Sequence, residues 1–515
     1  MTAPATKRAP DADLRAALMM TLALTVVRVF VLFRTPLELH PDEAQYWLWS
    51  RTLAFGYHSE PPMVAWTIWA TTHLGGDAEP WVRLAAPLLQ GGATLLVFAI
   101  GRRLYGGAAA LAAAALYALV PAIQLSASVI ATDAPLLFFL GLSILAYVAL
   151  QPAQGRARLL LAAGLGAALG LAFLSEYAAV YAVIGVALHL ALSREARRAW
   201  TPASAILCLA SLGAVLAPNL GWNAAHGFAT LRHTLANANW AADDLMNGAG
   251  LARFLGAQLI VFGPIPLGAL MVGGALAARR RRIEPADLLL LCFILPPLAI
   301  VSVQSFVSRA HANGSGASYL PGAVLAAAWL MRWRARRWLA AALVLQGLAA
   351  ALFVTIILAP RTAEPLGLAS AFKRAKGWSQ TTQLILDRAR EERGQGLSAI
   401  AVNNRFLYYS VAYYGRDFFR DPLNPPLRAW TSAGAPQNQA KASAPLTPAD
   451  GQRVLAAADE GWFRDQMAAD FTKVSGPEID SVTLDRKHKR RVVMFIGEGF
   501  RPRPRPPVSV RTTPP

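Results

Sequence analysis

Long apolar runs are the feature of this sequence that most restricts how the chain can fold. The hydrocarbon core of a bilayer is about 30 Å thick and takes roughly 20 apolar helical residues to cross. Runs of this kind recur from residue 16 to residue 360 and then stop. We therefore expect about eleven membrane-spanning helices, in the ranges 16–34, 82–101, 107–125, 134–150, 159–175, 177–192, 202–218, 254–277, 286–304, 318–331 and 338–358.

Composition supports a membrane protein and excludes several other classes. The chain is 55% hydrophobic and only 15% charged, and its formal charge of +19 comes mostly from short arginine clusters between the apolar runs. Such clusters are topology signals rather than a nucleic-acid surface. The two cysteines, Cys208 and Cys292, both lie inside apolar runs, which argues against disulfides and thiolate metal sites.

The arginine clusters also predict which way the chain runs. If the N-terminus is cytoplasmic, alternate connections are cytoplasmic too, and those carry the basic clusters at 102–103, 156–158, 194–198, 279–282 and 332–337. The first run lacks the cleavage site of a signal peptide, so we keep it as a span. The periplasmic connections are then 35–81, 126–133, 219–253, 305–317 and everything after 359.

We expect an all-α polytopic membrane domain with juxtamembrane helices in its first periplasmic loop, followed by a small C-terminal α/β soluble domain. The predicted parts are a cytoplasmic N-terminus (1–15), the transmembrane domain (16–359), the periplasmic domain (360–500) and a disordered Pro/Arg tail (501–515). The segment 431–450 is rich in Ala, Pro, Ser and Gln and is typical of a linker. The expected location is the bacterial inner membrane.

Acidic residues stand where the first span leaves the membrane. Asp42 and Glu43 are followed at helical spacing by Tyr46, Trp47 and Trp49. One interpretation is an interfacial amphipathic helix with acids at its positively polarised start. The other is catalytic, because a carboxylate beside the membrane can deprotonate an acceptor hydroxyl. A further acid, Asp133, precedes Ala-Pro at the start of the fourth span, where it could equally be a plain helix N-cap.

Three groups of residues together resemble a known family. They are Pro41-Asp42-Glu43-Ala-Gln-Tyr-Trp-Leu-Trp-Ser, then Gly56-Tyr57 with Pro61-Pro62 and Ala65-Trp66, then Thr132-Asp133-Ala-Pro. This combination resembles the bacterial glycosyltransferases related to protein O-mannosyltransferases, which include aminoarabinose transferases and Rgt-type galacturonosyltransferases and share the C-type glycosyltransferase fold. The resemblance covers roughly residues 16–330.

The resemblance implies a function and roles for individual residues. Asp42 would be the general base, Glu43 its neighbour or a positioning residue, and Asp133 a second acid. The donor would be a polyprenyl-phosphate sugar, displaced with inversion, and the acceptor an envelope glycan, lipopolysaccharide or lipid A, or a protein. The departing phosphate needs cations or polar groups to hold it, and the candidates are Arg83, Arg309, His311, Tyr57, His58 and Glu60. No cofactor or metal is expected, because no ligand spacing is present.

Several positions depart from the family pattern. Members often have Asp-His-Pro-Pro where this chain has Ser59-Glu60-Pro61-Pro62, and a lysine where it has Glu176. The Asn313–Tyr319 segment also lacks the usual tryptophan and prolines. These changes point to a different donor or to loss of activity. Alternative functions are a lipid or glycan transporter and an inactive envelope-assembly partner, while a nucleotide-sugar donor is disfavoured because no Gly-rich phosphate loop is present.

Overall fold

The computed structural model describes residues 10–237, 247–280, 282–308, 311–431 and 436–504. The chain forms two compact units. One contains residues 1–34 and 54–354, and the other contains residues 35–53 and 355–515. The acid-bearing segment after the first span therefore packs with the C-terminal part of the chain. The domain boundary expected at residue 360 stays a prediction.

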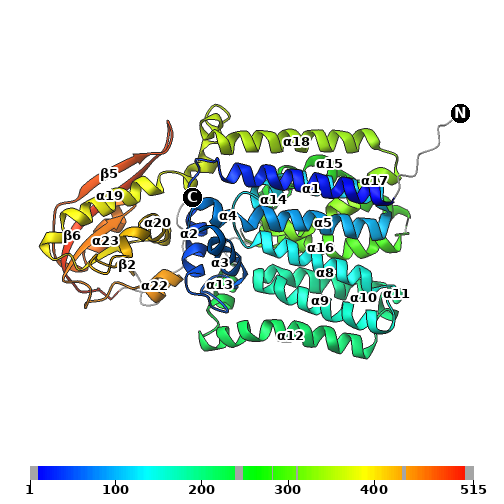
Figure 1. Cartoon of the computed structure of the whole chain (residues 1–515), viewed down its shortest axis with the longest axis horizontal. Helices are drawn as coiled ribbons and strands as arrows, with labels where there is room; N and C mark the ends of the chain where they lie inside the picture. Colours follow the sequence, from blue (N-terminus) through cyan, green and yellow to red (C-terminus); the bar gives the residue numbers. More distant parts are fainter. Residues whose placement is uncertain (1–9, 238–246, 281, 309–310, 432–435, 505–515) are drawn as a thin grey trace. The chain divides into compact units, whose positions relative to one another are not determined.

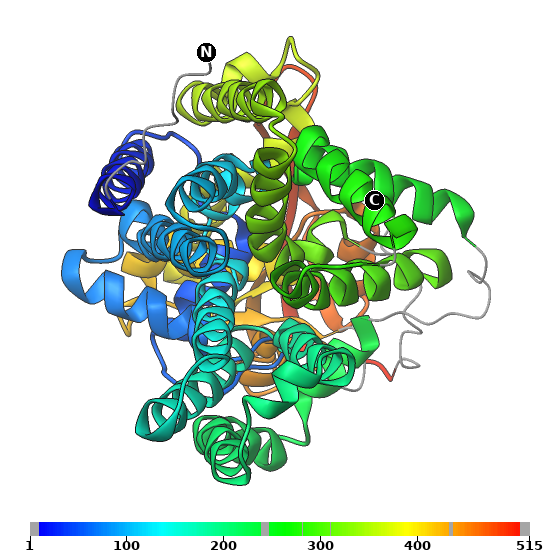
Figure 2. The ribbon, with the colours of Figure 1, turned by 90° about the vertical axis from the view of Figure 1, so that its right-hand side faces the viewer.

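The first unit is helical, and its long helices run side by side (Figures 1 and 2). Their bounds are α1 Pro10–Leu32, α3 Met63–Gly75, α4 Glu79–Arg83, α5 Ala85–Tyr105, α6 Gly107–Leu119, α7 Pro121–Ser126, α8 Asp133–Leu150, α9 Gly155–Ser175, α10 Val180–Leu192, α11 Arg194–Arg198, α12 Pro202–Ala225, α13 Ala229–Asn237, α14 Gly248–Val261, α15 Pro264–Arg280, α16 Pro285–Val307, α17 Tyr319–Arg332 and α18 Arg336–Leu358. Short 3-10 turns lie at Tyr177–Ala179 and Ala312–Ser318.

Within the described residues, seven helices are long and apolar enough to cross a membrane, and one bent pair raises this to eight. The expected count of about eleven is therefore not confirmed, although each expected range is helical and 107–125 is divided between α6 and α7. The range 254–277, expected as one span, is instead the pair α14 and α15, bent by 115°. Gly263, with φ +102°, and Pro264 break the helix there, and Gln346 donates to the carbonyl oxygen of Phe262 at 3.0 Å.

Close helix packing in this unit depends on small residues. A Cβ added at Gly166 of α9 would lie 2.0 Å from the carbonyl oxygen of Cys208 in α12, so only glycine permits this approach. Helix α17 is buried from Tyr319 to Leu330 on all its faces. A helix that is apolar all round belongs in the middle of a bundle, and α17 accordingly forms the core of this one.

The second unit combines α2 (Pro41–Ser50) with a six-stranded sheet and its helices. The strand order is β2-β1-β3-β6-β4, with β5 also pairing with β6. Strands β1, β2 and β3 are parallel, and β6 is antiparallel to its three neighbours. The bounds are α19 Trp378–Glu391, β1 Ala399–Val402, α20 Arg405–Tyr414, α21 Arg416–Phe419, β2 Leu427–Ala429, α22 Gln439–Ser443, β3 Arg453–Ala458, α23 Gly461–Ala468, β4 Phe471–Val474, β5 Glu478–Thr483 and β6 Lys489–Phe500, with 3-10 turns at Pro360–Ala363, Ala369–Ala375 and Arg393–Gln395.

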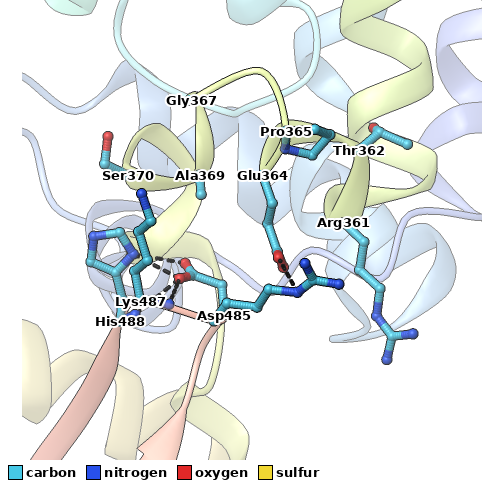
Figure 3. Close-up of a pocket in the computed structure, with 11 residues that line it drawn as sticks. Arg361, Thr362, Glu364, Pro365, Gly367, Ala369, Ser370, Asp485, Lys487 and His488 are labelled. Carbon is cyan, nitrogen blue, oxygen red and sulfur yellow. Dashed lines mark hydrogen bonds and ion pairs between the residues drawn. The ribbon is translucent and has the colours of Figure 1, made fainter.

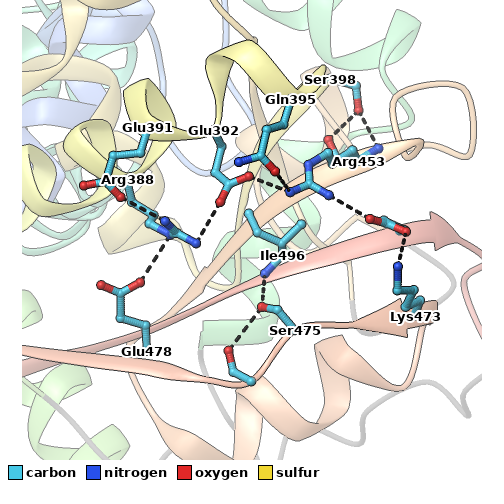
Figure 4. A network of polar contacts seen from close by, with 12 residues as sticks. Arg388, Glu391, Glu392, Gln395, Ser398, Arg453, Lys473, Ser475, Glu478 and Ile496 are labelled. Carbon is cyan, nitrogen blue, oxygen red and sulfur yellow. Dashed lines mark hydrogen bonds and ion pairs between the residues drawn. The ribbon is translucent and has the colours of Figure 1, made fainter.

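A network of charges fastens α19 and the turn after it to this sheet (Figure 4). Arg453 of β3 donates to Glu392 at 2.6 Å and to Glu498 of β6 at 2.7 Å. Arg388 contacts the same Glu392 at 2.7 Å and reaches Glu478 of β5 at 3.2 Å. Because Glu392 is buried, its charge depends on these two arginines.

The expected linker at 431–450 is only partly correct. Residues 432–435 lie outside the described residues, but α22 follows and Leu446 joins the apolar core beside the sheet. Asn438 caps α22 by accepting from the backbone N–H of Lys441 at 3.0 Å. Local capping and one apolar anchor therefore order a segment whose composition is typical of a linker. Of the tail, residues 505–515 lie outside the described residues.

Candidate functional site

The start of α2 is a complete helix cap. The Nδ1 atom of His40 accepts from the backbone N–H of Asp42 at 3.2 Å, and the Glu43 carboxylate accepts from the backbone N–H of His40 at 2.9 Å. This reciprocal pair is a capping box in which histidine takes the place of serine or threonine. Glu43 is 1% exposed. Its carboxylate therefore fixes the helix start, and Asp42 stands in the first turn with its side chain 36% exposed.

Asp42 is paired with a cation that the sequence did not suggest. Arg405 donates to the Asp42 carboxylate at 2.8 Å and to the side-chain oxygen of Gln45 at 3.0 Å. The imidazole of His40 lies 3.4 Å from the other carboxylate oxygen. Burial by itself raises the pKa of Asp42, but the contact with His40 and the charge of Arg405 outweigh burial and hold this pKa below its ordinary value.

Arg405 lies shortly after the end of a parallel strand. Strand β1 ends at Val402, and Asn403 and Asn404 then bind the Asp459 carboxylate that follows β3. Asn404 also caps α20, so Arg405 is the first residue of that helix. Helices are commonly started this way by asparagine. The guanidinium therefore projects from a hydrogen-bonded turn rather than from a free loop.

Helices α2 and α20 pack against each other and keep this pair together. The rings of Trp47 and Tyr413 meet edge to face at 4.9 Å, and the Tyr414 hydroxyl accepts from the backbone N–H of Leu39 at 2.8 Å. The Glu38 carboxylate accepts from the backbone N–H of Trp378 and Ser379 at the start of α19. Contacts on both sides of Asp42 therefore hold the segment 35–53 against the C-terminal residues of the second unit.

The second predicted acid lies in the first unit. Asp133 is the first residue of α8 rather than its N-cap, which is Thr132. The Asn313 side chain hydrogen-bonds Asp133, and the Thr132 hydroxyl donates to the Glu176 carboxylate at 3.2 Å. Burial raises the pKa of Glu176, and the neighbouring Asp133 raises it further. Asp133 and Glu176 therefore form a half-buried acidic pair in which one carboxyl readily keeps a proton.

The other predicted residues of the first loop shape a turn in the first unit. The backbone N–H of Tyr57 donates to the carbonyl oxygen of Glu60 at 3.1 Å, and the Thr230 hydroxyl donates to the carbonyl oxygen of Tyr57 at 2.6 Å. The His58 ring meets His233 edge to face at 5.7 Å. These contacts give Tyr57, His58 and Glu60 a structural role in this turn. Their role in donor binding stays a prediction.

The predicted cations differ in their placement. Arg83 is the last residue of α4 and is 3% exposed, and His311 is exposed just before the Ala312–Ser318 turn. Arg309 lies outside the described residues. Arg28, an intramembrane arginine in α1, faces protein and donates to the carbonyl oxygen of Ala118 at 2.6 Å. In the parts of the chain that the structure describes, no cluster of three potential metal ligands occurs.

The Asp42–Arg405 pair of the second unit can supply the general base of a displacement reaction. An ionised carboxylate beside a guanidinium stays deprotonated at neutral pH, and it can accept a proton from a hydroxyl as that hydroxyl begins to form a bond. The guanidinium can also hold a phosphate or carboxylate group close by. The only sequence signal for Arg405 is that it follows Asn403-Asn404 at the end of a short apolar stretch, which marks a turn but not the contact with Asp42.

Comparison with known proteins decides the family. The family described as dolichyl-phosphate-mannose-protein mannosyltransferase matches residues 59–222. The lipid A galacturonosyltransferase RgtD of Rhizobium johnstonii is 33% identical over 404 residues, which cover 78% of this chain and 83% of RgtD. The chain belongs to the Rgt, ArnT and protein O-mannosyltransferase superfamily of glycosyltransferases.

Solved structures support the same fold for this glycosyltransferase. ArnT from Cupriavidus metallidurans matches in its apo state with a TM-score of 0.61 and 16% identity, and in its undecaprenyl phosphate complex with 0.64 and 17%. Each comparison covers 93% of this chain and 97% of ArnT. The chain therefore shares the fold of ArnT, and its family membership makes it a multi-pass inner-membrane glycosyltransferase. This family membership sets the transporter alternative aside.

Proposed function

We propose that this glycosyltransferase transfers a uronic acid from a polyprenyl phosphate to lipid A at the periplasmic face, with Asp42 as the general base. The sugar and acceptor follow the relative RgtD, which shares 33% identity over most of both chains. The observation that carries the proposed base is the Asp42–Arg405 pair, because it keeps the carboxylate ionised and half-exposed. On the proposed topology the N-terminus is cytoplasmic and the C-terminal unit is periplasmic.

The proposed reaction is a single displacement. The acceptor hydroxyl attacks the anomeric carbon, the bond from that carbon to the phosphate oxygen breaks, and polyprenyl phosphate leaves with the electron pair. The hydroxyl proton passes to the Asp42 carboxylate. A base with a lowered pKa suffices, because the hydroxyl becomes acidic only when its oxygen is already bonding to carbon. The anomeric configuration inverts.

A uronic acid brings its own carboxylate into the site, and this negative charge needs a cation beside it. A cation should therefore hold the sugar carboxylate, and Arg405, with its side chain 40% exposed, is the proposed partner. Arg83 and His311 remain proposed phosphate contacts.

Complementation of a deletion strain tests the proposal. Lipid A from strains carrying wild type, Asp42→Asn or the control Asp417→Asn is analysed by mass spectrometry. Asp417 is an exposed aspartate of the same unit, paired with Arg420 at 2.7 Å. We expect wild type and Asp417→Asn to restore one uronic acid on lipid A and Asp42→Asn to fail at equal protein level. Restoration by Asp42→Asn would refute its role, and a different sugar or acceptor would refute the substrate assignment.

A further inference from the structure

A cavity of about 1070 Å³ lies in the second unit, apart from the Asp42–Arg405 pair. One wall is the segment 361–370, which follows the end of α18, and the other is the tip of the β5–β6 hairpin at 485–488 (Figure 3). A smaller cavity of about 370 Å³ shares Arg361, Glu364 and Asp485 with it and adds Lys376. A cavity of this size accommodates a small ligand or a headgroup.

The acids of this cavity are already engaged. Asp485 accepts from the backbone N–H of Lys487 and of His488, each at 2.9 Å, and from the His488 ring at 2.8 Å. Its carboxylate therefore holds the hairpin turn. Glu364 pairs with Arg486 at 3.3 Å. Both carboxylates are therefore paired with groups of the cavity wall. Neither of them pairs with the side chain of Arg361 or Lys487.

Two cations of the cavity wall remain available. Arg361 and Lys487 are exposed, and their side chains make no hydrogen bond or ion pair with any residue that the structure describes. Figure 3 shows them on opposite walls, with Lys487 extending toward Ser370. Two unpaired cations facing one cavity favour a ligand that carries a phosphate.

Apolar side chains next to these cations point to a lipid. Leu366 and Leu368 are 51% and 42% exposed and flank Gly367, which lines the cavity. Arg361 follows only three residues after Leu358, where α18 ends, and α18 is apolar and long enough to cross a membrane. Exposed leucines beside cations at the end of such a helix are the pattern of a membrane interface.

We propose that this cavity binds the phosphate headgroup of an anionic glycerophospholipid from the leaflet in which α18 ends. Arg361 and Lys487 hold the phosphate, and Leu366 and Leu368 contact the upper part of the acyl chains. Basic residues beside a membrane attract anionic lipids in this way. The site would hold the second unit against the bilayer surface, whatever sugar and acceptor the enzyme uses.

The test uses the full-length protein in a neutral detergent. Dioctanoyl phosphatidylglycerol is titrated in, and hydrogen exchange of the peptides that cover 361–370 and 484–488 is followed. We expect saturable protection of both peptides. The double variant Arg361→Gln/Lys487→Gln should need a concentration about 25-fold higher, at about fivefold per cation. The matched control Arg420→Gln/Lys473→Gln removes two cations of the same unit that do not line the cavity and should leave the titration unchanged.

Three outcomes would overturn the proposal. Equal protection by dioctanoyl phosphatidylcholine would mean that only the leucines bind, and equal protection by glycerol phosphate would mean a site for free phosphate. An unchanged titration in the Arg361→Gln/Lys487→Gln variant, with its melting temperature preserved, would mean that these cations do not hold the headgroup.

Discussion

Replacing Arg405 by glutamine tests whether this cation sets the proton affinity of the proposed base. Opposite charges about 4 Å apart at an effective dielectric constant near 20 attract by about 4 kcal/mol. The side chains of Arg405 and Asp42 are 40% and 36% exposed, so solvent screening reduces this to about 1 kcal/mol. Removing this attraction therefore makes protonation of the Asp42 carboxylate easier by about 1 kcal/mol, which raises its pKa.

The sign of the effect follows from the direction of the shift. Arg405 lowers the pKa of Asp42, so its loss lets the carboxylate take up a proton at a higher pH. The acidic limb of the kcat/KM profile should therefore move to higher pH. Arg405→Lys keeps the charge and should move the limb by less than half as much.

The assay must separate the effect of Arg405 from that of His40, which also contacts the Asp42 carboxylate. The profiles are therefore best measured in a His40→Asn background, where asparagine keeps the helix cap. Initial rates of sugar transfer from a polyprenyl-phosphate donor are recorded from pH 4 to pH 8. If Arg405→Gln lowers the rate equally at every pH and the limb stays in place, Arg405 acts on another group and the reasoning fails.

Three further predictions concern stability, measured as melting of the protein in detergent. Asp287→Asn should cost about 2–3 kcal/mol, because it removes the carboxylate that binds Arg332 at 2.6 Å, and unchanged melting would contradict this. Because burial raises the pKa of Glu176 to about 8, ionisation of this carboxyl should cost stability as pH rises from about 4.5 through about 8, and Glu176→Gln should reduce that loss; an identical slope in both would refute it. Arg453→Met should cost about 2 kcal/mol by leaving the buried Glu392 with one arginine fewer, and a cost below about 0.5 kcal/mol would show that Arg388 alone suffices.

The sequence predicts the helical elements well, because hydrophobic length is a local property. A helix lies in every range expected to span the membrane, and the C-terminal segment expected to be α/β carries helices and a sheet. The bend at Gly263 was missed, because neighbouring apolar residues on both sides hide it within a single hydrophobic run. The number of membrane crossings also depends on how short helices such as α17 pack, which hydropathy does not report.

The site is less accessible from the sequence than the fold. The acids Asp42 and Asp133 stand out because charges are rare beside apolar spans, but Arg405 is one of many arginines in a soluble-looking segment. Its importance depends on the packing of α20 against α2, and no local pattern records that contact. Glu43, predicted as the neighbour of Asp42 or a positioning residue, is the buried carboxylate that caps α2, and only the packed structure reveals that contact.

The pairing of Asp42 with Arg405 joins two residues that are 363 positions apart in the chain. During synthesis at roughly 5–20 residues per second, the arginine would emerge about 20–70 s after the aspartate. Throughout that interval the nascent chain can thread its helices into the bilayer while the carboxylate still lacks its cation. Completion of this centre therefore waits for the last third of translation, and a ribosome that stalls after α18 would leave a fully inserted but chemically unfinished protein.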